Sequence, residues 1–247
     1  MLLAIDIGNT NISFALFGRE RIYKIWDIPV KHYTKTRLLK HIKDTRLSAA
    51  LICSVVPKIT GRLCSDINNI TNIKPKVIGK DIKVPLKNLY LNKKQLGPDR
   101  LTNAYAASQI YPLPAIVVNC GTAITIDAVS KNKEYLGGFI IPGLSSSLSA
   151  LNLSTALLPK VKIIPASGSI GRNTRTCILN GVIIGSAAAV DALILKIRLK
   201  AGGNTQVIGT GGNIDLIKKF SRYIIKTDKE LLLKGIFLLF KNAFKNN

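Results

Sequence analysis

The chain has 247 residues, of which 47% are hydrophobic and 20% are charged, a composition typical of a globular protein with its own core. Lys and Arg number 36 against 13 Asp and Glu, so the formal net charge is +23. No basic helix, zinc finger or aromatic RNA-binding pattern accompanies that charge, so nucleic acid is not an expected partner. A diffuse attraction for anions is the simpler interpretation.

The sequence predicts a cytoplasmic protein without a membrane partner. The most apolar stretch, Cys177–Val190, is too short to cross a bilayer and carries two glycines. The N-terminus lacks the basic region of a signal peptide. Four scattered cysteines and two histidines do not have the spacing of a disulfide framework or a zinc site.

The first half of the chain is predicted to begin with a β-meander and to continue with alternating helices and strands. Apolar runs bounded by turn residues predict the three strands of the meander, Leu2–Ile5, Ile12–Phe17 and Glu20–Pro29. The elements expected next are a helix at Lys35–Asp44, a strand at Ala49–Val55, a helix at Ile59–Ile70, a strand at Lys76–Ile78, a loop at Lys80–Gln95 and a helix from Gly97 to about Tyr111.

The second half repeats this order. Its predicted elements are strands at Ala115–Val118, Ile124–Val129 and Tyr135–Ile140, helices at Leu144–Leu157 and Thr174–Lys200, a strand at Gln206–Ile208 and a helix from Leu231. Two halves with the same order of elements predict a duplicated α/β fold. We expect two domains, residues 1–112 and 113–247, with a ligand in the cleft between them.

Polar turns follow the first strand of each half. The first is Asp6-Ile7-Gly8-Asn9-Thr10-Asn11, and Asn119-Cys120-Gly121-Thr122-Ala123 repeats its frame 113 residues later (119 − 6). A third turn, Gly209–Asn213, also follows a predicted strand. Each turn alone is explained by ordinary hairpin chemistry. Together they indicate backbone N–H groups and hydroxyls arranged around phosphates, with Asp6 holding a metal ion or its waters.

Asp99 has two explanations. In Gly97-Pro98-Asp99-Arg100, proline fits the first helical position and Asp99 fits the first turn, where a carboxylate complements the helix dipole. The functional alternative is a general base that accepts a hydroxyl proton during phosphoryl transfer, with Arg100 near an anionic group. The local pattern leaves both open.

Taken in order, the motifs resemble those of the type III pantothenate kinases, of the acetate and sugar kinase/Hsp70/actin superfamily. The residues that carry the resemblance are Asp6–Thr10, Tyr90, Gly97–Arg100, Gly121–Asp127, Gly137–Gly143, Gly171–Thr174 and Thr210–Gly212. The resemblance implies duplicated ribonuclease-H-like (actin-like ATPase) domains. It also implies transfer of the ATP γ-phosphate to the hydroxyl of pantothenate, giving 4′-phosphopantothenate in the first step of coenzyme A biosynthesis.

The resemblance also implies roles for individual residues. Asp99 would be the proton acceptor, and Thr122 would contact ATP. The first phosphate turn would consist of Asp6, Ile7, Gly8, Asn9, Thr10, Asn11, Ile12 and Ser13. Pantothenate would be held by Tyr90, Gly97, Pro98, Asp99, Arg100 and Thr174. Mg²⁺, a monovalent cation (K⁺ or NH₄⁺) and a homodimer are implied as well, with Asp6 reaching Mg²⁺ through water.

One residue departs from the family pattern. Asn119 stands where the family usually has an aspartate that helps to bind the monovalent cation. An amide oxygen can ligate K⁺ but brings no charge. Three alternatives follow: the cation binds more weakly, Asp127 and backbone carbonyls compensate, or cation dependence is lost. A weakened relative acting as a nucleotide-binding accessory or regulatory factor is the alternative function.

Overall fold

The structure, a computed structural model, describes residues 1–201 and 204–244, and the chain forms two compact units. The first unit comprises Met1–Leu86, Asn92–Ala106 and Leu231–Asn247, and the second comprises Lys87–Leu91 and Ala107–Glu230. The division into duplicated domains at residues 112 and 113 stays a prediction.

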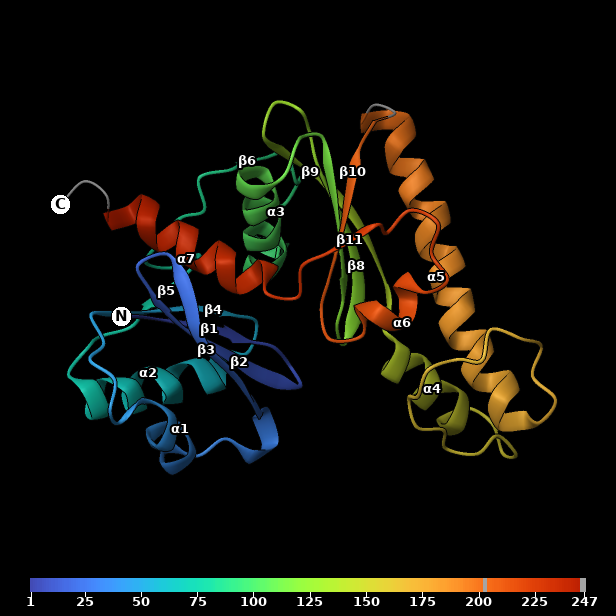
Figure 1. The fold of residues 1–247 in the computed structure, drawn as a ribbon, viewed down its shortest axis with the longest axis horizontal. Helices are drawn as coiled ribbons and strands as arrows, with labels where there is room; N and C mark the ends of the chain where they lie inside the picture. Colours follow the sequence, from blue (N-terminus) through green and yellow to red (C-terminus); the bar gives the residue numbers. More distant parts are fainter. Residues whose placement is uncertain (202–203, 245–247) are drawn as a thin grey trace. The chain divides into compact units, whose positions relative to one another are not determined.

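The first unit is built on a five-stranded sheet in the order β3-β2-β1-β4-β5 (Figure 1). The strands are β1 (Leu2–Ile7), β2 (Asn11–Gly18), β3 (Arg21–Pro29), β4 (Ala49–Ser54) and β5 (Lys76–Val77). Strands β1 to β3 are antiparallel, whereas β4 pairs parallel with β1 and with β5. Its helical segments are η1 (Val30–His32), α1 (Lys35–Ile42), α2 (Pro57–Thr71), η2 (Lys93–Gln95), α7 (Leu231–Phe244) and the first part of α3 (Pro98–Ile110).

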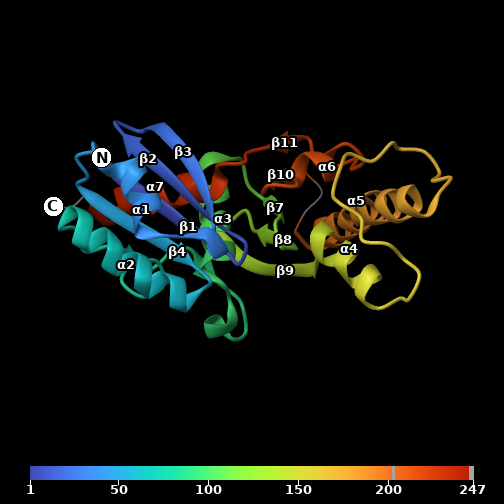
Figure 2. The same cartoon turned by 90° about the horizontal axis from the view of Figure 1, so that it is seen from below.

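Helices cover both faces of this sheet (Figures 1 and 2). Alternate residues Leu3, Ile5 and Ile7 of β1 join the core that α1 and α2 complete. The opposite face carries Asp6 and is covered by α7, whose Phe237 stacks on Phe17 with ring centroids 4.6 Å apart. Helix α3 packs beside α7 at Gly235, where a Cβ would lie 2.9 Å from Thr102. The polar residue of β1 therefore lies on the α3 and α7 side of the sheet.

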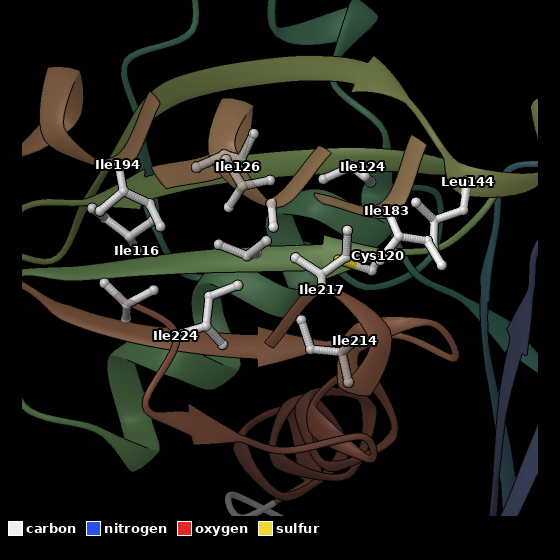
Figure 3. Close-up of a cluster of buried hydrophobic side chains, with 14 of the residues drawn as sticks. Ile116, Cys120, Ile124, Ile126, Leu144, Ile183, Ile194, Ile214, Ile217 and Ile224 are labelled. Carbon is white, nitrogen blue, oxygen red and sulfur yellow. The ribbon is translucent and has the colours of Figure 1, made fainter. Parts of the chain in front are cut away.

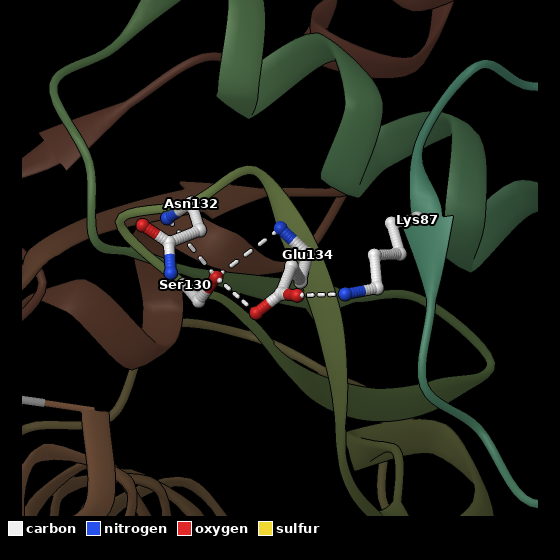
Figure 4. A network of polar contacts seen from close by, with 4 residues as sticks. All are labelled: Lys87, Ser130, Asn132 and Glu134. Atoms are coloured by element: carbon white, nitrogen blue, oxygen red, sulfur yellow. Dashed lines mark hydrogen bonds and ion pairs between the residues drawn. The ribbon is translucent and has the colours of Figure 1, made fainter.

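The second unit repeats the same strand order with one strand added, β11-β10-β7-β8-β9-β6. Its strands are β6 (Lys87–Asn88), β7 (Ala115–Cys120), β8 (Ala123–Val129), β9 (Glu134–Pro142), β10 (Gln206–Thr210) and β11 (Lys226–Thr227). Strands β7 to β9 form an antiparallel meander, and β10 pairs parallel with β7. Strand β6 pairs parallel with β9, and there Lys87 Nζ lies 2.6 Å from Glu134 Oε1 (Figure 4). The repeated meander followed by parallel strands confirms the predicted fold class.

The core of the second unit lies between this sheet and its helices. Ile116, Cys120, Ile124 and Ile126 of β7 and β8 are fully buried and face α5 (Thr174–Ala201) and α6 (Ile214–Lys218) (Figure 3). A further helix, α4 (Leu144–Leu153), contributes Leu144 to the same core.

Helix α5 has the length and composition of a membrane span, with a mean hydropathy of 2.0 over its most apolar window. Its Ile183, Ala187, Val190 and Ile194 are nonetheless fully buried against the sheet. The apolar sequence is therefore explained, on this face, by packing in the core of the unit.

Three details of the predicted secondary structure were wrong. Helix α4 ends at Leu153 rather than Leu157, because Ser154 leaves the helical conformation as its C-cap. The region Lys80–Gln95, predicted as a loop, contains β6 and η2. The short elements α6 and β11 were not predicted, because five- and two-residue segments have too few residues to show a period.

Candidate active site

The first polar turn connects β1 to β2. The Gly8 N–H donates to the Asn11 carbonyl at 3.0 Å, and the Val30 N–H donates to the Thr10 carbonyl at 2.9 Å. The first bond closes the turn, and the second joins it to the residue that follows β3. Asn9, Thr10 and Asn11 are exposed, so the polar residues of the turn lie at the surface of the first unit. The local geometry suits contacts to a phosphate oxygen.

Asp6 precedes this turn and is surrounded by negative charge. Burial raises its pKa from 3.8 to about 7, and the carboxylates of Asp99 and Asp27 add to the shift. The strand register explains why Asp27 is close to Asp6, because Ser13 of β2 pairs with Asp6 on one side and with Asp27 on the other. The structure therefore brings Asp6 and Asp99 together within the first unit, and it adds Asp27, which was not predicted.

Asp99 lies in the first turn of α3, as the sequence predicted. Burial raises its pKa, while backbone N–H groups of Arg100 and Asp99 and the Arg100 charge oppose the rise. A Cβ on Gly97 would lie 2.4 Å from Asp99 Oδ1, so glycine leaves the space that this carboxylate occupies. Arg100 is buried, with 7% of its surface exposed. The helix-start explanation for Asp99 is correct, and its raised pKa and proximity to Asp6 are also consistent with a general base.

Cys53 lies beside Asp6 and contacts Thr102, and neither residue was predicted. Cys53 pairs with Asp6 in the parallel register of β4 and β1, and its Sγ lies 3.9 Å from Thr102 Oγ1. Burial and the charges of Asp6 and Asp99 raise the pKa of the Cys53 thiol far above its ordinary value. The thiol therefore stays protonated and acts as a weak hydrogen-bond donor. The sequence carried no signal for this neighbour, because the proximity of Cys53 to Asp6 depends on the register between β4 and β1.

The second polar turn connects β7 to β8. The Gly121 N–H donates to the Ala123 carbonyl at 3.0 Å. The start of α4 packs on this turn: Ser146 Oγ donates to the Thr122 carbonyl at 3.0 Å, and a Cβ on Gly143 would lie 2.3 Å from the same oxygen. Thr122 itself is exposed. A helix N-terminus beside an exposed threonine is a suitable setting for an anion.

The third turn, after β10, packs on the end of β7. Gly211 has a φ of +90°, and a Cβ there would lie 2.5 Å from Asn119 Oδ1 and 2.8 Å from the Cys120 backbone. The Asn213 N–H donates to the Cys120 carbonyl at 3.1 Å. The structure therefore brings Asn119 and two of the three glycine-bearing turns together in the second unit.

Tyr90 and Thr174, the two expected pantothenate contacts outside the first unit, lie in different settings. The Tyr90 ring is tilted against Tyr135 at 6.1 Å between centroids, and Tyr135 Oη donates to Asp127 Oδ1 at 2.7 Å. Thr174 is the first residue of α5, and the preceding Asn173 accepts a bond from the Thr176 N–H at 3.0 Å. Thr174 thus lies in the first turn of α5, and Asn173 caps this helix.

The acidic residues of the first unit suit a cation that has further ligands. Among residues 1–201 and 204–244, no group of three His, Cys, Asp or Glu side chains is placed to hold a metal ion by itself. A divalent cation at Asp6 would therefore depend on phosphate oxygens and water, which is the usual situation for Mg²⁺. The excess negative charge that raises the pKa of Asp6 fits such an ion, because a cation would relieve it.

Comparison with known proteins identifies relatives over nearly the whole chain. A family model described as type III pantothenate kinase matches residues 2–196. A type III pantothenate kinase of Finegoldia magna is 35% identical over 252 residues, which cover 97% of this chain and 96% of that protein.

Solved structures share the fold at lower identity. A protein from Campylobacter jejuni described as a Baf family transcriptional activator superposes with a TM-score of 0.60 at 20% identity, covering 99% of this chain and 100% of that one. The activator of the 2-hydroxyisocaproyl-CoA dehydratase from Clostridium difficile, solved with ADPNP, gives a TM-score of 0.58 at 12% identity and covers 99% and 96%. At such identities the likeness shows the fold alone.

Proposed function

Because the chain belongs to the type III pantothenate kinase family, we propose that it transfers the γ-phosphate of ATP to the hydroxyl of pantothenate. The product is 4′-phosphopantothenate, and the reaction is the first step of coenzyme A biosynthesis. The enzyme is an ATP-dependent small-molecule kinase. The observation that carries the assignment to this site is the proximity of Asp99, at the start of α3, to Asp6, which precedes the first polar turn.

Asp99 is the proposed general base. It accepts the proton of the pantothenate hydroxyl as the hydroxyl oxygen attacks the γ-phosphorus and the bond from that phosphorus to ADP breaks. Its raised pKa supports the role, because a base works best when its pKa is near the operating pH. The proposed contacts to pantothenate are Tyr90, Gly97, Pro98, Asp99, Arg100 and Thr174.

The nucleotide is assigned to the polar turns. Residues 6–13 and Thr122 are proposed to contact the phosphates of ATP. Mg²⁺ would be held near Asp6 through water and by the phosphates, where it would neutralise charge on the transferred group. Support comes from the exposure of Asn9, Thr10 and Thr122 and from the acidic surroundings of Asp6.

Asn119 is the proposed ligand of a monovalent cation, K⁺ or NH₄⁺. Its amide oxygen can contact the cation but brings no negative charge to the site. Asp127 lies on the same face of the sheet, since Val117 pairs with Asp127 and Asn119 pairs with Thr125. Its carboxylate is buried and accepts the Tyr135 hydroxyl. Reduced cation affinity is therefore the expected consequence of Asn119.

A homodimer in the cytoplasm is the proposed state of the enzyme. Helix α5 carries an exposed stripe of small and apolar residues at helical spacing, Cys177, Gly181, Gly185, Ala188, Ala192, Leu195 and Leu199. A Cβ on Gly181 or Gly185 would meet no atom within 4 Å. Such a face suits close packing against a second copy. Light scattering of Ala188→Glu, with Ala188→Ser as the control, tests it: the Glu variant should be monomeric and the Ser variant dimeric.

The deciding experiment is an ATP-consumption assay with pantothenate, run with and without K⁺. Pantothenate-dependent ADP release supports the kinase, and its absence in every condition would leave the accessory-factor alternative. That alternative is favoured only by Asn119 and the net charge of +23. A DNA-binding titration at two salt concentrations, run beside the kinase assay, separates the two.

A further inference from the structure

The first unit contains a pocket that none of the assigned roles uses. It has a volume of about 250 Å³ and lies between α1 and the end of β3. Helix α1 lines it with Arg37, Lys40 and His41, and β3 lines it with Asp27, Ile28 and Pro29. Spacings of three and four residues place the α1 side chains on one helix face. We propose that this pocket binds a small anion that carries a phosphate group.

The charge of Arg37 is not explained by the stability of α1. Lys40 lies in the last turn of α1, where a cation complements the helix dipole. Arg37 lies near its start, where a cation opposes the dipole, and the first turn has no acidic residue. In the part of the chain that the structure describes, neither the Arg37 guanidinium nor the Lys40 ammonium forms an ion pair. Two cationic residues that line one pocket and form no ion pair suit an anionic ligand.

The wall of the pocket is already ordered by its neighbours. The His41 ring stacks on Trp26 at 4.8 Å between centroids, and Trp26 stacks on Phe14 at 5.0 Å with an angle of 2° between the rings. Lys24 Nζ donates to the His41 carbonyl at 3.3 Å. A wall held by three stacked rings loses little further freedom when a ligand binds, which favours affinity.

The size and chemistry of the pocket select the ligand class. At about 250 Å³ it is smaller than the roughly 300–1,000 Å³ typical of sites for drug-sized ligands, so it suits phosphate or pyrophosphate better than a nucleotide. A guanidinium can bind phosphate through two parallel hydrogen bonds, and an ammonium adds a point charge. The single carboxylate, Asp27, leaves the lining with a positive balance.

The pocket lies one strand away from the first polar turn. Ile28 pairs with Ile12, and Pro29 pairs with Asn11. The residues that line the pocket from β3 are therefore hydrogen-bonded neighbours of the strand that leaves the turn. The anion site we propose is next to the ATP site of this unit but does not include its turn residues.

Fluorescence tests the proposal, because Trp26 is the only tryptophan of the chain and stacks on a residue of the pocket. Pyrophosphate is titrated into the full-length protein without ATP. We expect a saturable change in emission, and at least about tenfold weaker binding in the double variant Arg37→Ala/Lys40→Ala. The control, Lys58→Ala/Lys76→Ala, removes two exposed lysines of the same unit and should bind within twofold of the wild type. Arg37→Lys, which keeps the charge but loses the planar fork, should be intermediate.

Several results would overturn the proposal. One is the absence of a saturable signal, and another is equal weakening in both double variants, which would mean diffuse charge attraction. Unchanged binding in Arg37→Ala/Lys40→Ala would place the anion elsewhere. A duplex oligonucleotide is titrated in the same way. If the duplex changes the Trp26 emission and pyrophosphate does not, Arg37 and Lys40 bind nucleic acid rather than a small anion. Circular dichroism of each variant, and Arg37→Lys as the mildest change, keep these outcomes separate from misfolding.

Discussion

Asp6 and Asn119 occupy equivalent positions in the two units. Each is the fifth residue of a six-residue strand, β1 or β7, and the two strands have the same pattern of buried residues. Each pairs with a hydroxyl residue on the next strand, Ser13 or Thr125. The first unit therefore has a carboxylate where the second has an amide, although the surrounding strands are alike. This difference in charge at equivalent places leads to the first prediction.

Asn119→Asp should introduce or strengthen stimulation by K⁺. A carboxylate adds a full negative charge beside the Gly211 turn, so we expect the apparent K⁺ affinity to rise at least about tenfold, or ~1.4 kcal/mol. The measurement is the rate of ADP release against KCl concentration, with choline chloride holding the ionic strength constant. Asn132→Asp, in an exposed hairpin of the same unit, is the matched control and should leave the K⁺ curve unchanged. An identical K⁺ response in wild type and Asn119→Asp would remove position 119 from the cation site.

Asp99→Asn should leave the fold intact and lower kcat by about 10²–10⁴-fold, because the general base is lost while the helix start is kept. Asparagine can still accept backbone N–H bonds, so the thermal midpoint should change little. The comparison is kcat and circular dichroism beside Asp215→Asn, which alters an exposed first-turn aspartate of α6. Near wild-type turnover in Asp99→Asn would exclude Asp99 as the base.

The sequence predicted both meanders and the order of the main helices, because these depend on apolar runs and turn residues. It also placed Asp99 at a helix start and Thr122 in a turn, where the structure has them, whereas Asp6 lies inside β1 rather than in the turn that was predicted from Asp6 to Asn11. It did not predict Asp27 and Cys53 as neighbours of Asp6, because that proximity depends on strand register, which a single residue pattern does not define. Similarly, β11 and α6 are held by contacts rather than by a local period.

Asp6 should make the stability of the protein depend on pH. Its pKa is about 7 in the folded state and about 3.8 in the unfolded state. Between these values the folded protein binds more protons, so the free energy of unfolding should fall as pH rises from about 4 to about 7. Asp6→Asn removes this penalty and should be more stable than the wild type above pH 7, by roughly 4 kcal/mol, and little different below pH 4.

Urea unfolding at several pH values, without Mg²⁺ or nucleotide, measures this effect. Asp44→Asn, which removes an exposed carboxylate of the same unit, is the control and should keep the slope of the wild type. If Asp6→Asn and the wild type show the same dependence on pH, the carboxylate of Asp6 is not destabilised by its neighbours.

Gly211→Ala and Gly212→Ala should differ sharply although the two glycines are adjacent. Gly211 has a φ of +90° and a Cβ there would overlap Asn119 Oδ1 and the Cys120 backbone, so alanine should destabilise the second unit by roughly 2–4 kcal/mol. A Cβ on Gly212 would meet no atom within 4 Å, so alanine there should change the free energy of unfolding by less than about 1 kcal/mol. Denaturant unfolding of both variants gives the difference, and the KM for ATP shows whether displacing Asn119 and Cys120 also disturbs nucleotide binding. Equal stabilities would mean that the third turn does not pack on the end of β7 as the structure has it.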